Sequence, residues 1–137
     1  MSRKFGRSAD DVKVSVNLSP VALGLIDVLK GSGYHSTRSD LIRQAVSSYL
    51  TRHQTRIDSI VGREGYFVGR ITIGRHELET ALRDDHRMSI RCIGVVTIAP
   101  DVTPDLADRA IESIKVSGVL SAPRKVLEQL GSRVRRG

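Results

Sequence analysis

Residues 12–19 read VKVSVNLS, and this stretch decides the fold of the first third of the chain. Apolar side chains occupy every second position, which is the period of a β-strand with one buried face. These apolar residues are Val12, Val14, Val16 and Leu18. The alternate positions between them are Lys13, Ser15 and Asn17. The pattern therefore predicts a strand with one apolar face and one polar face.

Two helices are predicted directly after this strand. Ser19-Pro20 starts the first, because serine caps free amides and proline suits the first turn. This helix runs to about Lys30 and ends at the glycines of residues 31–33. Thr37 caps a second helix that runs from Arg38 to about Arg52. Both helices carry an apolar stripe at three- and four-residue spacing, so each needs a surface to cover it.

The strand has no partner within its own module. One strand cannot satisfy its own backbone, and three short elements cannot bury both apolar stripes. The simplest partner is the same strand of a second copy, which gives a homodimer with a two-stranded antiparallel ribbon. Such a ribbon fits the major groove of DNA.

Residues 12–52 resemble the ribbon-helix-helix repressors of the Arc and MetJ type in the alternating strand, the Ser-Pro helix start, the glycine-containing turn and the STRSDLIRQAV start of the second helix. The resemblance implies that the outward strand residues contact bases and that the start of the second helix grips a phosphate. The base-contacting residues would be Lys13, Ser15 and Asn17. The phosphate-contacting residues would be Thr37, Arg38 and Ser39. We also expect a basic N-terminal arm to touch phosphates through Arg3, Lys4 and Arg7.

The charge distribution favours the same kind of partner. Lys and Arg number 22 against 15 Asp and Glu, for a net charge of +7. The excess lies in residues 1–56, with a net of +5, and in the tail, which carries Arg133, Arg135 and Arg136; residues 57–130 have a net of −1. Basic side chains displace counterions from phosphates, so the first module is expected to bind double-stranded DNA. We therefore predict two modules, residues 1–56 and 57–137, joined near residues 54–62 by a helix end and a short loop.

The second module alternates strands and helices, with no convincing internal repeat. Its expected strands and helices are strands 66–73, 88–99 and 115–120, a helix at 75–85, a helix from Pro104 with Leu106, Ala110, Ile111 and Ile114 on one stripe, and a helix at 123–130. They predict a small α/β sandwich, so the whole chain is assigned to the α+β class. The layout is similar to the ACT-like regulatory domain of the nickel-responsive repressors. That resemblance implies a dimer of dimers and a small effector bound by this module.

No metal, cofactor or catalytic site is expected. The nickel-responsive repressors bind metal through a His-x-His pair, whereas this chain has only His76, His86 and Cys92 in the region. Cys92 lies in an apolar strand and is expected to be a buried hydrophobe. No catalytic constellation is present, so the protein is not expected to be an enzyme. No stretch approaches the roughly 20 apolar residues of a membrane span, and a cytoplasmic protein is expected.

The sequence therefore predicts a sequence-specific DNA-binding transcriptional regulator, most simply a repressor. Two alternatives use the same DNA-binding fold. One is the antitoxin of a toxin–antitoxin pair, which usually adds a flexible toxin-binding segment. The other is a plasmid-partition or relaxosome accessory protein. The folded pattern after residue 65 counts against the first alternative, and the position of the binding sites would decide the second.

Overall fold

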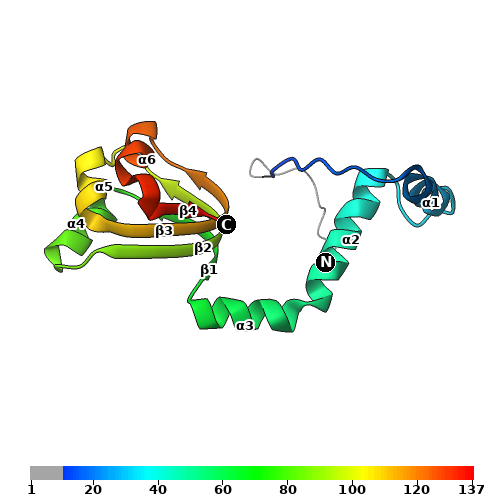
Figure 1. The fold of residues 1–137 in the computed structure, drawn as a ribbon, viewed down its shortest axis with the longest axis horizontal. Helices are drawn as coiled ribbons and strands as arrows, with labels where there is room; N and C mark the ends of the chain where they lie inside the picture. The colour runs from blue at the N-terminus through cyan, green and yellow to red at the C-terminus, as the bar shows by residue number, and fades with distance from the viewer. Residues whose placement is uncertain (1–10) are drawn as a thin grey trace. The chain divides into compact units, whose positions relative to one another are not determined.

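The computed structural model describes residues 11–137. The chain forms two compact units, one ending at Gln54 and the other running from Thr55 to Gly137 (Figure 1). Among the described residues, no helix has both the length and the apolar character that a membrane crossing requires.

The first unit contains α1 (Pro20–Gly31) and α2 (Arg38–Arg52). Both helices start at the predicted caps, because the Ser19 hydroxyl accepts from the Ala22 amide at 3.1 Å and Thr37 accepts from the Asp40 amide at 3.1 Å. The amides in the first turn of a helix have no carbonyl acceptor within the helix, and each hydroxyl supplies one. The two helix predictions are confirmed to within a residue at each end.

The predicted strand at residues 12–18 does not form within a single chain. Between residues 11 and 19 the backbone belongs to no helix or sheet. Its alternate apolar side chains are exposed, with fractions of 66% for Val12, 78% for Val14 and 69% for Val16. A strand exists only as part of a ladder, so the segment has the pattern of a strand but lacks a partner.

The predicted short loop near residues 54–62 is wrong, because this segment is the helix α3 (Gln54–Glu64). Its apolar residues Ile57, Ile60 and Val61 follow helical spacing. The helix ends just before Gly65, which has a φ of +67°. Such a left-handed glycine is a common helix terminator.

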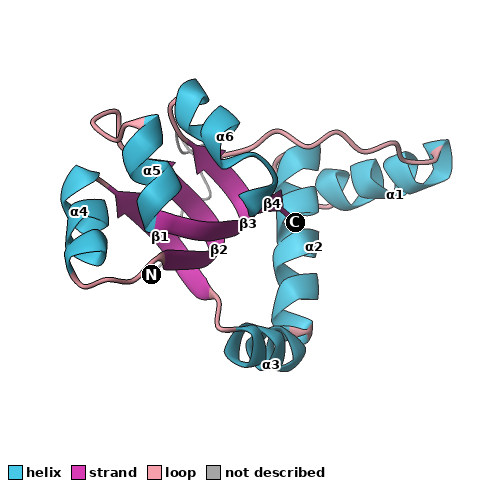
Figure 2. Ribbon diagram, turned by 60° about the vertical axis from the view of Figure 1, so that its left-hand side comes forward, coloured by secondary structure: helices cyan, strands magenta, loops and turns pink. Residues whose placement is uncertain are grey.

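The second unit is built on a four-stranded, wholly parallel sheet in the order β1-β2-β3-β4. Its strands are β1 (Phe67–Ile73), β2 (Met88–Ile98), β3 (Ile111–Ser121) and β4 (Val134–Arg136). The connecting helices are α4 (Arg75–Arg83), α5 (Pro104–Ala110) and α6 (Arg124–Leu130), the last followed by the short 3-10 turn η1 (Gly131–Arg133). Because parallel crossovers are right-handed and each strand lies beside the preceding one, the helices cover the same face of the sheet (Figure 2).

The ACT-like layout expected for this unit differs from the structure. That layout requires two consecutive strands between its helices, whereas here a helix follows each of the first three strands. The helix from Pro104 also ends earlier than expected, at Ala110, and Ile111 and Ile114 belong to β3. An irregularity in the β2–β3 register beside Met88 lets both isoleucines face the core despite their three-residue spacing. The three-residue β4 was not predicted.

A glycine row crosses the sheet and reveals an internal repeat that the sequence reading missed. Gly69 pairs with Gly94 and Gly94 with Gly118, at spacings of 25 and 24 residues. Their φ angles are +139°, +136° and +132°. A Cβ on Gly94 would overlap the carbonyl oxygen of Gly69, and one on Gly118 would overlap that of Gly94. Three β–α units therefore stack with the same bend, and only glycine fits at the two inner positions.

The core lies between this sheet and its helices. Val96 and Ile98 from β2, Leu78 from α4 and Val126 from α6 are almost fully buried. Each such side chain contributes roughly 1.5–3 kcal/mol relative to an exposed one. In β2 the buried residues are all even-numbered, while Ile93 and Val95 face the other side and remain half-buried. The helices therefore cover one face of the sheet, and within one chain the other face of β2 is only half-buried.

Candidate nucleic-acid interface

The segment carrying the predicted base-contacting residues is exposed throughout. Lys13, Ser15 and Asn17 are exposed, and so are the apolar residues that alternate with them. Leu18, the most covered of those apolar residues, is still 43% exposed. Exposing four alternate apolar side chains to water is unfavourable. This face is therefore expected to pack against a surface that the single chain does not provide.

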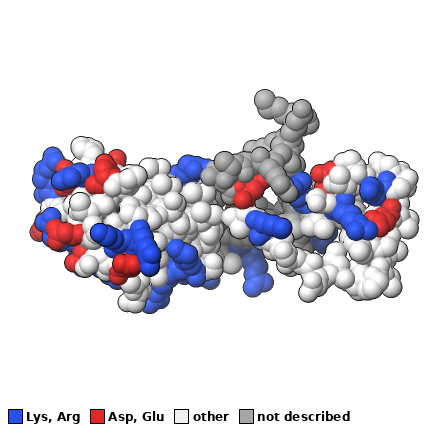
Figure 3. Space-filling view, turned by 90° about the horizontal axis from the view of Figure 1, so that it is seen from above, with Lys and Arg blue, Asp and Glu red and all other residues white. Residues whose placement is uncertain are grey.

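The two helices that follow, α1 and α2, also expose apolar side chains. Neither α1 nor α2 contains a buried residue. Exposed fractions reach 61% for Leu25, 67% for Val28, 54% for Val46 and 61% for Tyr49. In the view of Figure 3, much of the surface of these helices is uncharged, while acidic and basic side chains alternate over the second unit. The apolar side chains of α1 and α2 therefore remain exposed in the single chain.

The start of α2 is arranged as a helix N-terminus that can receive an anion. Thr37 caps the Asp40 amide, and a hydroxyl that accepts from an amide can still donate its own proton. The Asp40 carboxylate is held by the Ser36 hydroxyl and lies 3.5 Å from the Arg43 guanidinium. The hydrogen bonds from Ser36 and then Thr37 hold the pKa of Asp40 below its usual value. First-turn amides and the positive end of the helix dipole favour phosphate at this point.

The guanidinium of Arg38 is bound within the chain. Its Nε and Nη2 donate to the two carboxylate oxygens of Asp27 at 2.8 and 2.7 Å. The hydrogen bond raises the pKa of Arg38 and lowers that of Asp27. Both side chains are about half exposed, so the pair adds little stability but ties α1 to the start of α2. Asp27 was missed in the sequence, because an Asp and an Arg eleven residues apart give no local signal.

The remaining predicted contacts are placed as follows. Ser39 lies in the first turn of α2 and is exposed. Arg3, Lys4 and Arg7 lie outside the described residues. The structure therefore brings Thr37, Arg38 and Ser39 together at one helix start and leaves the strand residues on a separate, unpaired segment.

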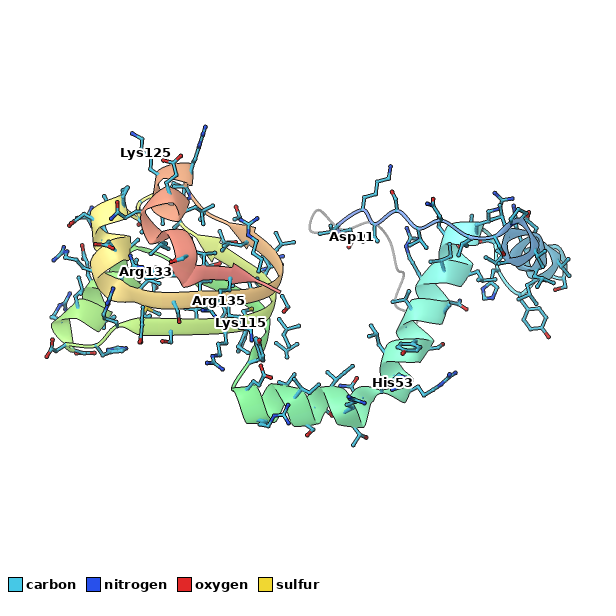
Figure 4. All side chains as sticks on the ribbon, in the orientation of Figure 1. Asp11, His53, Lys115, Lys125, Arg133 and Arg135 are labelled. Carbon is cyan, nitrogen blue, oxygen red and sulfur yellow. The ribbon has the colours of Figure 1, made fainter. Side chains whose placement is uncertain are left out.

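The arginines near the chain end do not form a free basic tail. Arg133 donates to the carbonyl oxygens of Asp108 and Ile111 at 3.1 and 3.0 Å and bonds the Asp108 carboxylate. Arg135 lies in β4, paired in register with Lys115 of β3 (Figure 4). Lys115 is itself 3.5 Å from the Glu64 carboxylate. Arg133 and Lys115 thus have structural roles, which shifts the expected DNA contacts toward the first unit.

The residues considered for metal binding or redox sensing do not form a site. Cys92 is fully buried, and burial raises the pKa of its thiol. A buried neutral thiol behaves as a small hydrophobic side chain rather than a sensor. Within residues 11–137, no three His, Cys, Asp or Glu side chains gather where they could hold a metal ion.

Comparison with known proteins agrees with this geometry. A family model described as the ribbon-helix-helix transcriptional regulator family matches residues 9–127. No curated protein and no solved structure matches the chain significantly. The family match includes residues of both units: it covers residues 12–18, the helices α1 to α5 and the strands β1 to β3, and it ends before β4.

Proposed function

Since the chain belongs to the ribbon-helix-helix transcriptional regulator family, we propose that it is a sequence-specific DNA-binding repressor that acts as a dimer. The observation that carries the proposal is the exposed, alternating apolar face of residues 12–18 followed by two helices without a buried residue. Two copies would pair these segments as an antiparallel ribbon and close one core between four helices. The same pairing points both polar faces outward, toward DNA.

The polar face of the ribbon has the chemistry needed to read bases. In the major groove, lysine donates to the O6 and N7 acceptors of guanine, and asparagine forms a bidentate pair with adenine. Serine hydrogen-bonds to either kind of base edge. Lys13, Ser15 and Asn17 would supply these groups twice, once from each copy. The two-fold axis of the dimer then calls for a palindromic or nearly palindromic site.

The phosphate grip would come from the start of α2. Thr37 and Ser39 would contact the phosphate through a hydroxyl and first-turn amides. Arg38 would act indirectly, because its guanidinium on Asp27 holds this helix start against α1. We retain Arg3, Lys4 and Arg7 as proposed contacts of an N-terminal arm.

The second unit would serve assembly. It has its own core, and residues 57–137 carry 13 Lys and Arg against 11 Asp and Glu, a net of +2 compared with +5 in residues 1–56, so its electrostatic attraction to phosphate is the weaker of the two. A folded unit of this kind counts against the antitoxin alternative, which calls for a flexible segment. We propose that it joins two dimers, as a platform on which a small effector could act, in a regulator that works in the cytoplasm.

Footprinting of the full-length protein on its own upstream region tests the function. We expect a discrete protected site with two-fold symmetry that persists as salt rises, while binding to random DNA fades. Uniform protection at every salt concentration would contradict sequence-specific binding. Sites confined to a plasmid partition or transfer locus would favour the partition or relaxosome alternative.

Thr37→Ala should weaken binding to operator and random DNA alike. The change removes a helix cap, worth about 1 kcal/mol of stability. It also removes a phosphate hydrogen bond, which at about 1 kcal/mol lowers affinity roughly fivefold. Affinities for both DNAs, measured at one salt concentration, give the check.

Ser19→Ala is the matched control for this prediction. Ser19 caps α1 with the same 3.1 Å geometry but is not assigned to phosphate. Ser19→Ala should lose similar stability and keep its affinity for DNA. Thr37→Ser keeps the hydroxyl, so it should bind DNA as the unaltered protein does. If Ser19→Ala weakens DNA binding as much as Thr37→Ala does, the effect belongs to helix stability and the phosphate role is wrong.

A further inference from the structure

The parallel sheet of the second unit is covered by helices on one face only. Helices α4, α5 and α6 pack on the face that carries the even-numbered, buried residues of β2 (Figure 2). The odd-numbered residues of β2 lie on the other face, which we call the open face. Wholly parallel sheets are almost always covered on both faces. The open face is therefore expected to have a cover that the single chain does not supply.

Residues that pair in register form rows across the open face. The middle rows carry apolar side chains, because Val68 is in register with Ile93, and Val95 with Val119. Val68 is 60% exposed, and the other three are only partly buried. Arg70, in register with Val95, lies on the edge strand and therefore at the rim of this face. The centre of the open face is thus apolar and partly exposed to water.

One end of the open face carries a row of cations. This cation row consists of Arg91, Lys115 and Arg135, which pair in register on neighbouring strands. Arg91 donates to the carbonyl oxygen of Glu64 at 2.9 Å, and the ammonium group of Lys115 lies 3.5 Å from the Glu64 carboxylate. Glu64 supplies one negative charge to this row, so this end of the face keeps an excess of positive charge.

The opposite end of the open face carries hydroxyl groups instead of charges. Thr72, Thr97 and Ser121 are in register there and form a hydroxyl row. Hydroxyl oxygens accept hydrogen bonds from guanidinium and ammonium groups. Along its strands the open face therefore changes from cations through apolar side chains to neutral hydrogen-bond acceptors.

We propose that the open face packs against the open face of a second copy, with the strands of the two sheets antiparallel, and that this contact joins two ribbon dimers. The inference rests on the proposed function, in which the second unit joins two dimers. A two-fold axis across the strands places the cation row of each copy over the hydroxyl row of the other and the apolar rows over each other. An axis along the strands would place cations over cations, which is unfavourable. The charge pattern thus favours a second copy as the cover, because every row then has a compatible partner and the contact closes after two sheets.

The size of the open face explains why the contact would join dimers and not single chains. Three strands of seven residues span about 14 × 23 Å, roughly 300 Å² in projection. A stable interface buries about 800 Å² per partner, so one pair of sheets is a weak contact. Two ribbon dimers make two such contacts, and the second forms at the high effective concentration that the first creates.

Sedimentation equilibrium of the full-length protein tests the contact. We expect the mass of four chains for the unaltered protein and of two chains for Ile93→Glu, because the new carboxylate would lie between the two sheets. Ile93→Val, and Gln129→Glu on the exposed surface of α6, should keep the mass of four chains. Cys92 is the one cysteine of the chain and is fully buried, so a thiol that stays unreactive shows that the second unit of a variant is folded. A two-chain mass for the unaltered protein, or a four-chain mass for folded Ile93→Glu, would overturn the proposal.

Two charge variants of Thr97 test the orientation of the sheets. Thr97 is polar and not buried, so both variants are expected to fold even where Ile93→Glu does not. Thr97→Glu would face the cation row of the second copy and should lower the dissociation constant of the two dimers by on the order of tenfold, a gain that fades as salt rises. Thr97→Lys should raise that constant, and Gln129→Lys should leave it unchanged. Equal weakening by both Thr97 variants, or no effect of either, would overturn the proposal.

Footprinting separates this inference from the proposed function. The two-chain Ile93→Glu protein should still protect a single operator site, because its ribbon is unchanged. Loss of specific DNA binding by an unaltered protein of four chains would overturn the proposed function and leave this interface standing. A normal footprint from folded Ile93→Glu that keeps four chains would overturn the interface and leave the proposed function standing.

Discussion

Replacing Gly94 with alanine will unfold the second unit. Its φ of +136° is a conformation that non-glycine residues adopt at a cost of about 1–3 kcal/mol. The new methyl group would also overlap the carbonyl oxygen of Gly69, which belongs to backbone and cannot rotate away. The strands must separate to relieve the overlap, so we expect a total loss of at least about 4 kcal/mol, a large fraction of a small domain's stability.

Thermal unfolding followed by circular dichroism, with amide exchange in β2, checks this result. Gly62→Ala is the first control, because it lies in α3 with open space around it, and alanine should be neutral or stabilising by about 0.5–1 kcal/mol. Gly33→Ala is the second, because its φ of +87° is strained for alanine but its surroundings are open. Gly33→Ala should be destabilised only by the cost of placing alanine at a positive φ. Equal stability of Gly94→Ala and Gly33→Ala would contradict the steric account.

Val14→Asp should abolish both the pairing of two chains through residues 12–18 and DNA binding. Val14 is the most exposed of the alternating apolar residues in the single chain and would lie at the centre of the ribbon in the dimer. Each dimer would then bury two carboxylates against apolar side chains, and unpaired buried charges cost several kcal/mol. We expect a loss of at least about 4 kcal/mol, on the order of a thousandfold in the dimer dissociation constant. Sedimentation equilibrium of the full-length protein measures it.

Ser15→Asp is the matched control on the opposite face. The same carboxylate, one residue away, would face DNA instead of the core. This variant should keep the dimer and lose DNA binding through repulsion from phosphates. If Val14→Asp keeps the full mass of the unaltered protein at micromolar concentration, the alternating segment is not the dimer interface, because loss of the ribbon must at least halve that mass even where the second unit still joins two copies.

The helices of the first unit were predictable because their signals are local. Ser19-Pro20 and Thr37 each specify a helix start within four residues, and the structure begins α1 and α2 at these positions. The strand pattern of residues 12–18 was also readable, but in the single chain this segment belongs to no sheet, and its pairing with a second copy is our proposal. Local sequence therefore predicts the helices and the strand pattern. The partner of the strand is inferred instead from the apolar side chains that a single copy leaves exposed.

The topology of the second unit was not predictable to the same degree. Parallel pairing joins residues about 25 positions apart, such as Gly69 and Gly94, and no local signal specifies it. The nearly equal spacing of Gly69, Gly94 and Gly118, 25 and then 24 residues, was present in the sequence, but three single glycines among twelve are a weak signal of a repeat. At the candidate site, the Arg38–Asp27 pair escaped notice for the same reason, because a tertiary contact between two helices brings the residues together.

The central claim is that the outward side chains of the ribbon read the DNA sequence, and a specificity ratio tests it most directly. Affinities for an operator and for random DNA are compared at one salt concentration for the unaltered protein, Lys13→Ala, Asn17→Ala and Thr37→Ala. We predict that the two strand variants lose about 1–3 kcal/mol of operator binding and keep their affinity for random DNA, which lowers the ratio. Thr37→Ala should weaken both and leave the ratio unchanged. Equal losses on operator and random DNA for the strand variants would show that residues 12–18 do not read the sequence.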